Sequence, residues 1–154
     1  MTLCNNGGII TSTSPTVRSG AFTVNVKGLS GNTTYYFRGY ATNSAGTGYS
    51  ADDTFLTLPS TTVATSPTDV TTTGFTANWT APSGNGTISG YNLCVQDQLN
   101  NGVPRYDCRL VSAPATSQAV TGLNPKTTYH YQVNANNGSG LSSNSNTISV
   151  TTSD

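Results

Sequence analysis

The sequence predicts an all-β protein made of two related antiparallel β-sandwiches, and three observations lead to this prediction. Thr, Ser, Asn and Gly make up half of the 154 residues, Glu is absent, and the abundant Thr, Tyr and Val suit pleated strands. Apolar and polar residues alternate in short runs separated by turn residues, which is the period of a strand with one buried face. A segment of the first third recurs 94 residues later, so one structural unit is present twice.

This repeat defines the expected domain organisation. Residues 28–37 align with residues 122–131 at the offset of 94, and the agreement continues at Ala41/Ala135, Asn43/Asn137 and Gly46/Gly140. A gap of one residue then aligns Phe55 with Ile148. We therefore expect a first module over residues 1–58, a linker over residues 59–63 and a second module over residues 64–154.

The first copy is shorter than the second on its N-terminal side. In the second copy 54 residues precede the strand near Ala119, whereas only 20 precede the equivalent strand at residues 21–26. The difference matches two strands with their turns, so we expect the first module to lack its first two strands. The inner faces of Phe22, Phe37 and Phe55 would then be open. Either the chain is a fragment of a longer polypeptide, or strands of a neighbouring copy complete the module.

The elements of the second copy follow from its alternation and its turn residues. About seven short strands and no helix are expected, and the clearest strands are at residues 75–79, 91–95, 105–111, 129–135 and 148–150. Residues 82–86 have the composition of a loop, and residues 100–102 that of a turn.

Several spaced residues of the second copy resemble the landmarks of the fibronectin type III family. These are Trp79, Tyr91 and the pattern Leu123-x-Pro125-x-Thr127-x-Tyr129, over residues 63–152. The resemblance implies a sandwich in which the corner tyrosine buries its ring and returns its hydroxyl to nearby backbone. The expected core residues of the two modules are Tyr35, Phe37, Trp79, Tyr91, Leu123, Tyr129 and Tyr131.

The first copy resembles a bacterial form of the same family. Its residues 33–47 are similar to modules of secreted and surface proteins of the Bacteroidetes. The resemblance implies a non-catalytic structural, spacer or adhesion module, extracellular or on the cell surface, within a polysaccharide-degrading enzyme or an adhesin stalk. The rival interpretation is a self-assembling fibre subunit. The expected partners are other modules of the same polypeptide or copies of the chain.

Two of the three cysteines lie on strands that a hairpin would place side by side. We expect a disulfide between Cys94 and Cys108, which would close a loop of about 15 residues and contribute roughly 3 kcal/mol. Two free thiols are the alternative. Cys4 is left over, and pairs with a missing segment or with another chain. No metal site is expected, because no second pair of Cys or His stands near. A disulfide would indicate an oxidising compartment.

Composition and motifs exclude several classes of function. Six Lys and Arg residues, balanced by six Asp, cannot form a patch for nucleic acid. No apolar run has the length of a membrane span. His130 is expected to point to solvent, and Asp52 and Asp53 are a solvated pair rather than a catalytic or Ca²⁺-binding one. Neither an enzyme nor a cofactor is expected.

One strand of the first copy carries the best candidate for binding. Tyr36, Arg38 and Tyr40 alternate with Phe37, Gly39 and Ala41, so they would share the outer face of a single strand. Aromatic rings beside a guanidinium can stack on a partner such as a glycan, or on one another as a ladder that stiffens an exposed sheet.

Overall fold

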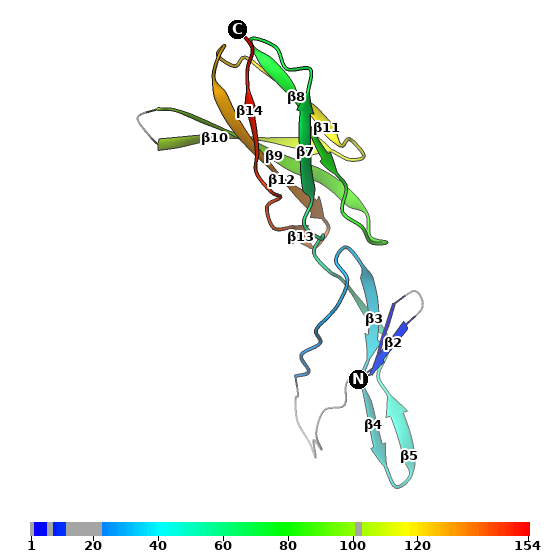
Figure 1. The fold of residues 1–154 in the computed structure, drawn as a ribbon. Coiled ribbons are helices and arrows are strands. Elements are labelled where there is room, and N and C mark those ends of the chain that lie inside the picture. Colours follow the sequence, from blue (N-terminus) through cyan, green and yellow to red (C-terminus); the bar gives the residue numbers. More distant parts are fainter. Residues whose placement is uncertain (1, 6–7, 12–22, 101–102) are drawn as a thin grey trace.

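The structure is a computed structural model that describes residues 2–5, 8–11, 23–100 and 103–154. The regular elements in these residues are β-strands, and all of their pairings are antiparallel. The strands form two groups that follow each other along an elongated molecule (Figure 1). No described residue belongs to a helix that could cross a membrane.

The C-terminal group is a sandwich of two sheets. One sheet has the order β10-β9-β12, with β13 and β14 both paired to β12, and the other has the order β11-β8-β7. The strands are β7 (Val63–Thr68), β8 (Gly74–Thr80), β9 (Ile88–Asn100), β10 (Val103–Ser112), β11 (Ser117–Thr121), β12 (Thr128–Asn137), β13 (Gly140–Leu141) and β14 (Ile148–Thr151).

Alternation along these strands builds the core between the two sheets. Alternate residues in the central parts of these strands are buried, at positions 75, 77 and 79 of β8, 91, 93 and 95 of β9, and 129, 131, 133 and 135 of β12. The residues between them are more exposed, as expected for strands with one covered face. Trp79, Tyr91, Tyr129 and Tyr131 lie in this core. Leu123, which the sequence also places there, is half-buried and packs against the core from its edge.

The N-terminal group contains one four-stranded sheet and a projecting hairpin. Its sheet order, β2-β1-β3-β6, matches the order β10-β9-β12-β14 of the second group. The hairpin consists of β4 and β5. The strands are β1 (Thr2–Asn5), β2 (Gly8–Thr11), β3 (Thr34–Arg38), β4 (Tyr40–Asn43), β5 (Gly46–Tyr49) and β6 (Asp53–Leu56).

The same corner precedes the equivalent strands β3 and β12. The Tyr35 hydroxyl accepts a hydrogen bond from the backbone N–H of Ser30 at 2.9 Å. The Tyr129 hydroxyl accepts one from Asn124 at 3.0 Å. Asn32 and Lys126, at the same place in the two corners, both have a left-handed backbone, with φ of 48° and 51°. The repeat seen in the sequence is therefore also a repeat of backbone geometry.

The alignment of Phe55 with Ile148 is wrong. Tyr35 pairs with Phe55 across β3 and β6, and its counterpart Tyr129 pairs with Val150 across β12 and β14. Phe55 therefore corresponds to Val150, and the extra residue lies in the second copy. The hairpin of β4 and β5 differs here from the hairpin of β12 and β13. In the second copy β13 ends at Leu141 and the chain leaves the sheet before β14, whereas β5 in the first copy continues to Tyr49.

The strand expected at residues 21–26 does not form over residues 23–26, which have no sheet partner, and residues 21–22 lie outside the described part. Its counterpart β11 is held by hydrogen bonds to β8. Among the described residues of the N-terminal group, no strand takes the places of β7 and β8. Phe37 and Phe55 are half-buried on the face of the sheet that strands equivalent to β7 and β8 would cover. Phe22 lies outside the described residues.

Candidate functional site

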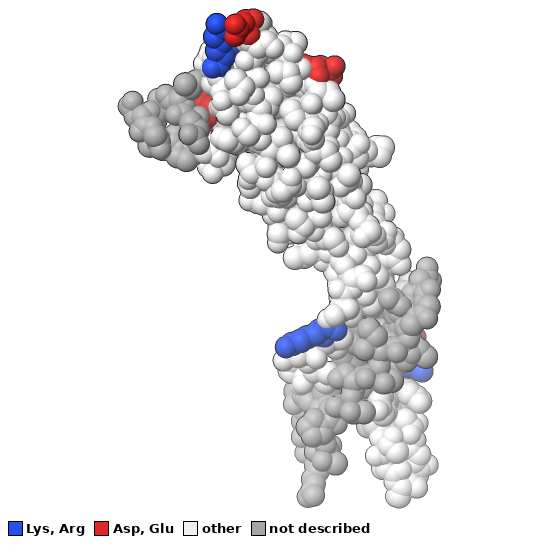
Figure 2. Space-filling view, in the orientation of Figure 1, with Lys and Arg blue, Asp and Glu red and all other residues white. Residues whose placement is uncertain are grey.

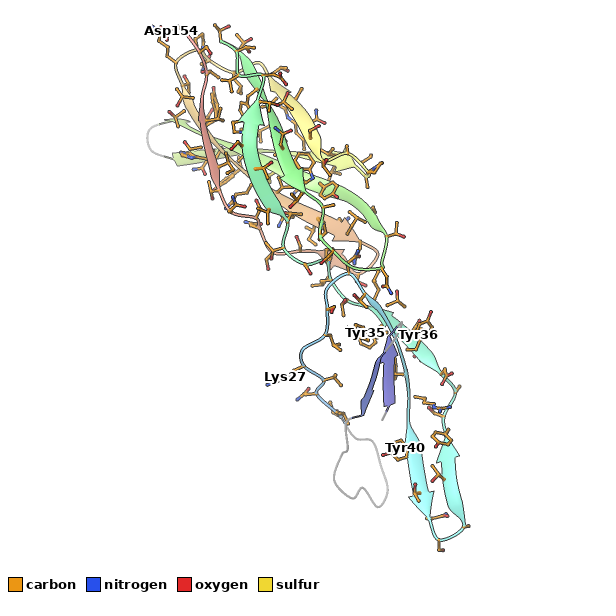
Figure 3. All side chains as sticks on the ribbon, turned by 45° about the vertical axis from the view of Figure 1, so that its right-hand side comes forward. Lys27, Tyr35, Tyr36, Tyr40 and Asp154 are labelled. Atoms are coloured by element: carbon orange, nitrogen blue, oxygen red, sulfur yellow. A yellow bond between two sulfur atoms is a disulfide. The ribbon has the colours of Figure 1, made fainter. Side chains whose placement is uncertain are left out.

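The aromatic side chains of the N-terminal group lie on two strands rather than one. Tyr35 faces inward on β3 and Tyr36 faces outward, so the two tyrosines lie on opposite sides of the strand (Figure 3). The strand ends at Arg38, and Tyr40 begins β4 in a separate two-stranded sheet. The expectation of one continuous strand through Tyr40 is therefore wrong. Gly39 makes the break, where its N–H and C=O bond to Ser50 instead of to β6.

Arg38 and Tyr40 are brought together by Tyr49, which the sequence reasoning missed. The Arg38 guanidinium lies over the Tyr49 ring, with its Cζ 4.3 Å from the ring centroid. Tyr40 lies opposite Tyr49 in the hairpin register, with ring centroids 6.2 Å apart. The turn residues Asn43-Ser44-Ala45-Gly46 were the available signal, because a hairpin closed there places residue 49 opposite residue 40. We call Tyr36, Arg38, Tyr40 and Tyr49 the aromatic patch.

Three of the four side chains in the aromatic patch pack against one another, because Arg38 and Tyr40 both contact Tyr49. Tyr36 and Tyr49 are 55% and 58% exposed, and Tyr40 is 40% exposed. The guanidinium of Arg38 already covers one face of Tyr49, and none of the described aromatic contacts includes Tyr36. Cation–π and aromatic pairs of this kind stabilise an exposed hairpin. The surface that remains for a ligand is the exposed part of the rings of Tyr36, Tyr40 and Tyr49.

The cysteines of the C-terminal group form the expected disulfide. Cys94 on β9 lies directly opposite Cys108 on β10, and their sulfurs are bonded. Both lie on the outer face of the sheet, because the neighbouring residues Leu93 and Val95 are buried in the core. Cys4 lies opposite Ile9 and Tyr36 in the backbone register, and its side chain lies outside the described residues.

The other candidate residues lie apart from one another. His130 is half-buried on the outer face of β12, opposite Gln96 and Ser149. Asp53 begins β6 in the N-terminal group, so it belongs to the other end of the molecule. In the described ranges, no three His, Cys, Asp or Glu residues come together as metal ligands would.

An open hollow of about 360 Å³ lies at the side of the sandwich. Asp97, Asp107 and Arg109 line it from β9 and β10, and the corner before β12 closes it. Arg109 donates two hydrogen bonds to Asp107, at 2.7 and 3.0 Å. These two charges therefore neutralise each other. The third charged residue, Asp97, is not part of this pair, and its Oδ1 is buried without a hydrogen-bond partner among the described residues.

Comparison with known proteins identifies the family. The model of the fibronectin type III domain matches residues 60–151, the part that forms the two-sheet sandwich with its tyrosine corner. The chain belongs to the fibronectin type III family. Two solved fibronectin type III structures are similar: the FN5 domain of Drosophila Lar and the sixth such domain of human fibronectin type III domain containing protein 3. Both are 26% identical to this chain, with TM-scores of 0.52 and 0.51.

These solved fibronectin type III domains cover part of the chain. They match 63% and 62% of it, and the matches include 99% and 86% of the two domains. A longer match is endoglucanase B of Cellulomonas fimi, which is 34% identical over 147 residues. That match includes 84% of this chain but spans only 13% of the length of the relative.

Proposed function

We propose that this chain is a non-catalytic spacer from a larger secreted or surface protein, in which an incomplete fibronectin type III module over residues 1–58 precedes a complete one over residues 64–154. The observation that carries the proposal is the match to endoglucanase B, in which most of this chain corresponds to a small part of a much longer enzyme. The matching order of the two four-stranded arrangements supports the tandem reading. The Cys94–Cys108 disulfide supports an oxidising compartment.

The surface supports a spacer better than a charged-ligand binder. Figure 2 shows Lys, Arg, Asp and Glu in a few places only, with neutral residues over most of the face in view. Neutral Thr, Ser and Asn side chains keep such a surface hydrated without attracting a charged partner. The proposed role is therefore to hold neighbouring domains apart.

Energy transfer between two fluorescent proteins fused to the two ends tests the spacer role. The folded chain should give a narrow distribution of single-molecule transfer efficiencies. A Gly/Ser linker of 154 residues, with a root-mean-square end-to-end distance of about 70 Å, should give a broad one because its ends fluctuate. A distribution as broad as that of the flexible linker would contradict the proposal. The isolated chain should also fail to hydrolyse a soluble cellulose derivative, and activity that co-purifies with it and is lost in His130→Ala would contradict the non-catalytic assignment.

Strand addition by a second copy is the second candidate function. It is favoured by the lack of a sheet partner over residues 23–26 and by the half-buried Phe37 and Phe55, whose counterparts in the second group are covered by β7, β8 and β11. Size-exclusion chromatography with light scattering should then give dimers or larger species that dissociate on dilution. A monodisperse monomer with a folded N-terminal group would eliminate this candidate.

A further inference from the structure

The two groups of strands meet through hydrogen bonds that Asn32 and Asn137 organise. Asn32 lies in the corner before β3, and Asn137 ends β12 in the second group. Their side chains are joined by a hydrogen bond of 3.1 Å from Asn137 Nδ2 to Asn32 Oδ1. Exposed fractions of 1% and 3% show that both residues are fully covered. Buried polar groups need hydrogen-bond partners, and each of these two amides finds one in the other. Separating the two groups of strands would break this hydrogen bond.

Every polar group of Asn32 has a partner, and three of these bonds cross to the second group. Its Nδ2 donates to the carbonyl of Gly86 at 2.6 Å, and its own carbonyl accepts from the Gly86 N–H at 2.7 Å. Its Oδ1 accepts from Asn137. Its N–H donates to the Leu58 carbonyl at 2.8 Å, within the first group. Asn32 thus connects the first group to two separate loops of the second.

Further bonds surround this centre on both sides. Asn137 Nδ2 also donates to the Thr57 carbonyl at 2.9 Å, and Ser139 Oγ donates to the Leu56 carbonyl at 2.6 Å. Asn85 Oδ1 accepts from the N–H of Thr34 at 3.1 Å. The contacts therefore spread over the loop at residues 84–86 and the turn at residues 137–140. Because the first group is bonded to two separate loops of the second, it cannot rotate about one loop without breaking its hydrogen bonds to the other.

Two glycines allow the backbones to approach closely. A Cβ atom on Gly86 would lie 2.7 Å from Asn32 Oδ1 and 2.7 Å from a methyl carbon of Leu56. A Cβ on Gly84 would lie 2.6 Å from the carbonyl oxygen of Gly31, and Gly84 has a φ of 128°. These neighbours all belong to the first group. By contrast, a Cβ on Gly138 would meet nothing within 4 Å.

The connecting segment is also held in place. Pro59 is buried, and Thr62 is 1% exposed with its hydroxyl donating to the Val133 carbonyl at 2.7 Å. Within the segment expected to form a linker, Thr62 is therefore fixed to the second group, while Ser60 lies beside Gly31 of the first group. Bending between the groups would have to break the contacts of Asn32 and Asn137.

The far end of the chain shows that the corner alone does not require Asn32. At the equivalent place the second copy carries Lys126, with nearly the same left-handed backbone, and its Nζ lies 3.1 Å from Asp154. Lys126 is exposed, whereas Asn32 is buried. The asparagine therefore serves the contact with the second group rather than the turn.

We propose that Asn32, Asn137 and the loop at residues 84–86 form a rigid joint, so that the two groups of strands move in solution as one body at a fixed angle. This rigidity is a property beyond the spacer role and does not depend on it. The joint, rather than the length of the connecting segment, determines the angle between the groups.

Residual dipolar couplings of backbone amides in the whole, disulfide-bonded chain test the proposal. In the wild-type chain a single alignment tensor should fit the amides of β3 and β6 together with those of β8, β9 and β12. The substitution Gly86→Ala should abolish this agreement, because its methyl group would collide with Asn32 and Leu56 while remaining outside the core of the second group. Gly138→Ala is the matched control and should behave as the wild type.

A second variant protects the test against a folding defect. Asn32→Lys introduces the residue that the second copy has at this place. It should also give each group of strands its own alignment tensor, while the amide chemical shifts of β8 to β14 stay unchanged. If Asn32→Lys unfolds the first group of strands, the result for Gly86→Ala alone tests the proposal. Separate tensors in the wild-type chain, or a single tensor in Gly86→Ala with both groups folded, would overturn the proposal.

Discussion

The hydroxyl of Tyr129 accepts a hydrogen bond from a backbone N–H five residues earlier, and the hydroxyl of Tyr35 does the same in the first copy. Each tyrosine thus buries its ring in the apolar layer while its oxygen pins the corner that leads into the strand. The ring stabilises the apolar core and the hydroxyl stabilises the corner, and a substitution to Phe removes the hydroxyl while keeping the ring.

Tyr129→Phe should lower the free energy of unfolding of the C-terminal sandwich by about 1 kcal/mol, because the ring remains and the N–H of Asn124 loses its acceptor. Urea unfolding followed by the fluorescence of Trp79 measures the change. Tyr106→Phe, at a residue that is 60% exposed, is the control and should be neutral within about 0.5 kcal/mol. A neutral Tyr129→Phe would show that water replaces the hydroxyl at no cost.

Burial raises the pKa of the hydroxyls of Tyr91 and Tyr131 above the ordinary value for tyrosine. Both groups are neutral in the folded chain to a higher pH than in the unfolded chain. Their contribution to stability is therefore complete below about pH 10 and is lost as the pH rises through the folded-state pKa.

Stability should accordingly be flat from about pH 7 to pH 9 and should fall above about pH 10. Urea unfolding at a series of alkaline pH values measures this. Tyr91→Phe removes one of the two titrating hydroxyls, so its alkaline loss should be smaller than that of the wild-type chain. An equal loss in both proteins would assign the effect to other groups.

At the scale of strands, the sequence predicts an element well where its own residues define both faces and its partner is present. β12 and β8 follow from alternation alone, and the corner before β12 follows from its spaced Leu, Pro, Thr and Tyr residues. Residues 23–26 alternate as well, yet form no strand, because a strand also needs a neighbour to accept its hydrogen bonds.

The candidate patch shows the same limit. Alternation placed Tyr36 and Arg38 on the outer face of β3 correctly, but Gly39 ends the strand before Tyr40. Tyr49 enters the patch only through the hairpin register, which a pattern along a single strand does not contain. The joint at Asn32 and Asn137 was not foreseen for a similar reason, since it depends on how two distant loops meet.

The disulfide belongs to this scale because it joins β9 to β10 outside the core. Replacing both cysteines, Cys94→Ala with Cys108→Ala, should lower the free energy of unfolding by about 3 kcal/mol in the chain-entropy description of a loop this short. Chemical unfolding of the two proteins measures the loss. Mass spectrometry of a digest without reductant should first show the Cys94–Cys108 link in the wild-type chain, and free thiols at both positions would contradict the structure.

At the scale of the whole molecule, charge contributes little to the fold. The net charge is zero, and the described ion pairs, Arg109 with Asp107 and Lys126 with Asp154, are both on the surface. Exposed pairs of this kind contribute at most about 1 kcal/mol and are screened by salt. The fold therefore depends on the core of aliphatic and aromatic side chains in the sandwich and on backbone hydrogen bonds, neither of which responds to modest ionic strength.

The stability of the chain should consequently be almost independent of salt. Raising NaCl from about 0.02 M to about 0.3 M shortens the screening length severalfold, yet the free energy of unfolding in urea should change by less than about 0.5 kcal/mol. Lys126→Ala removes one of the surface pairs and should leave this result unchanged. A change above about 1 kcal/mol would mean that charges interact over long distances in the folded chain, and that its neutral surface is less passive than a spacer requires.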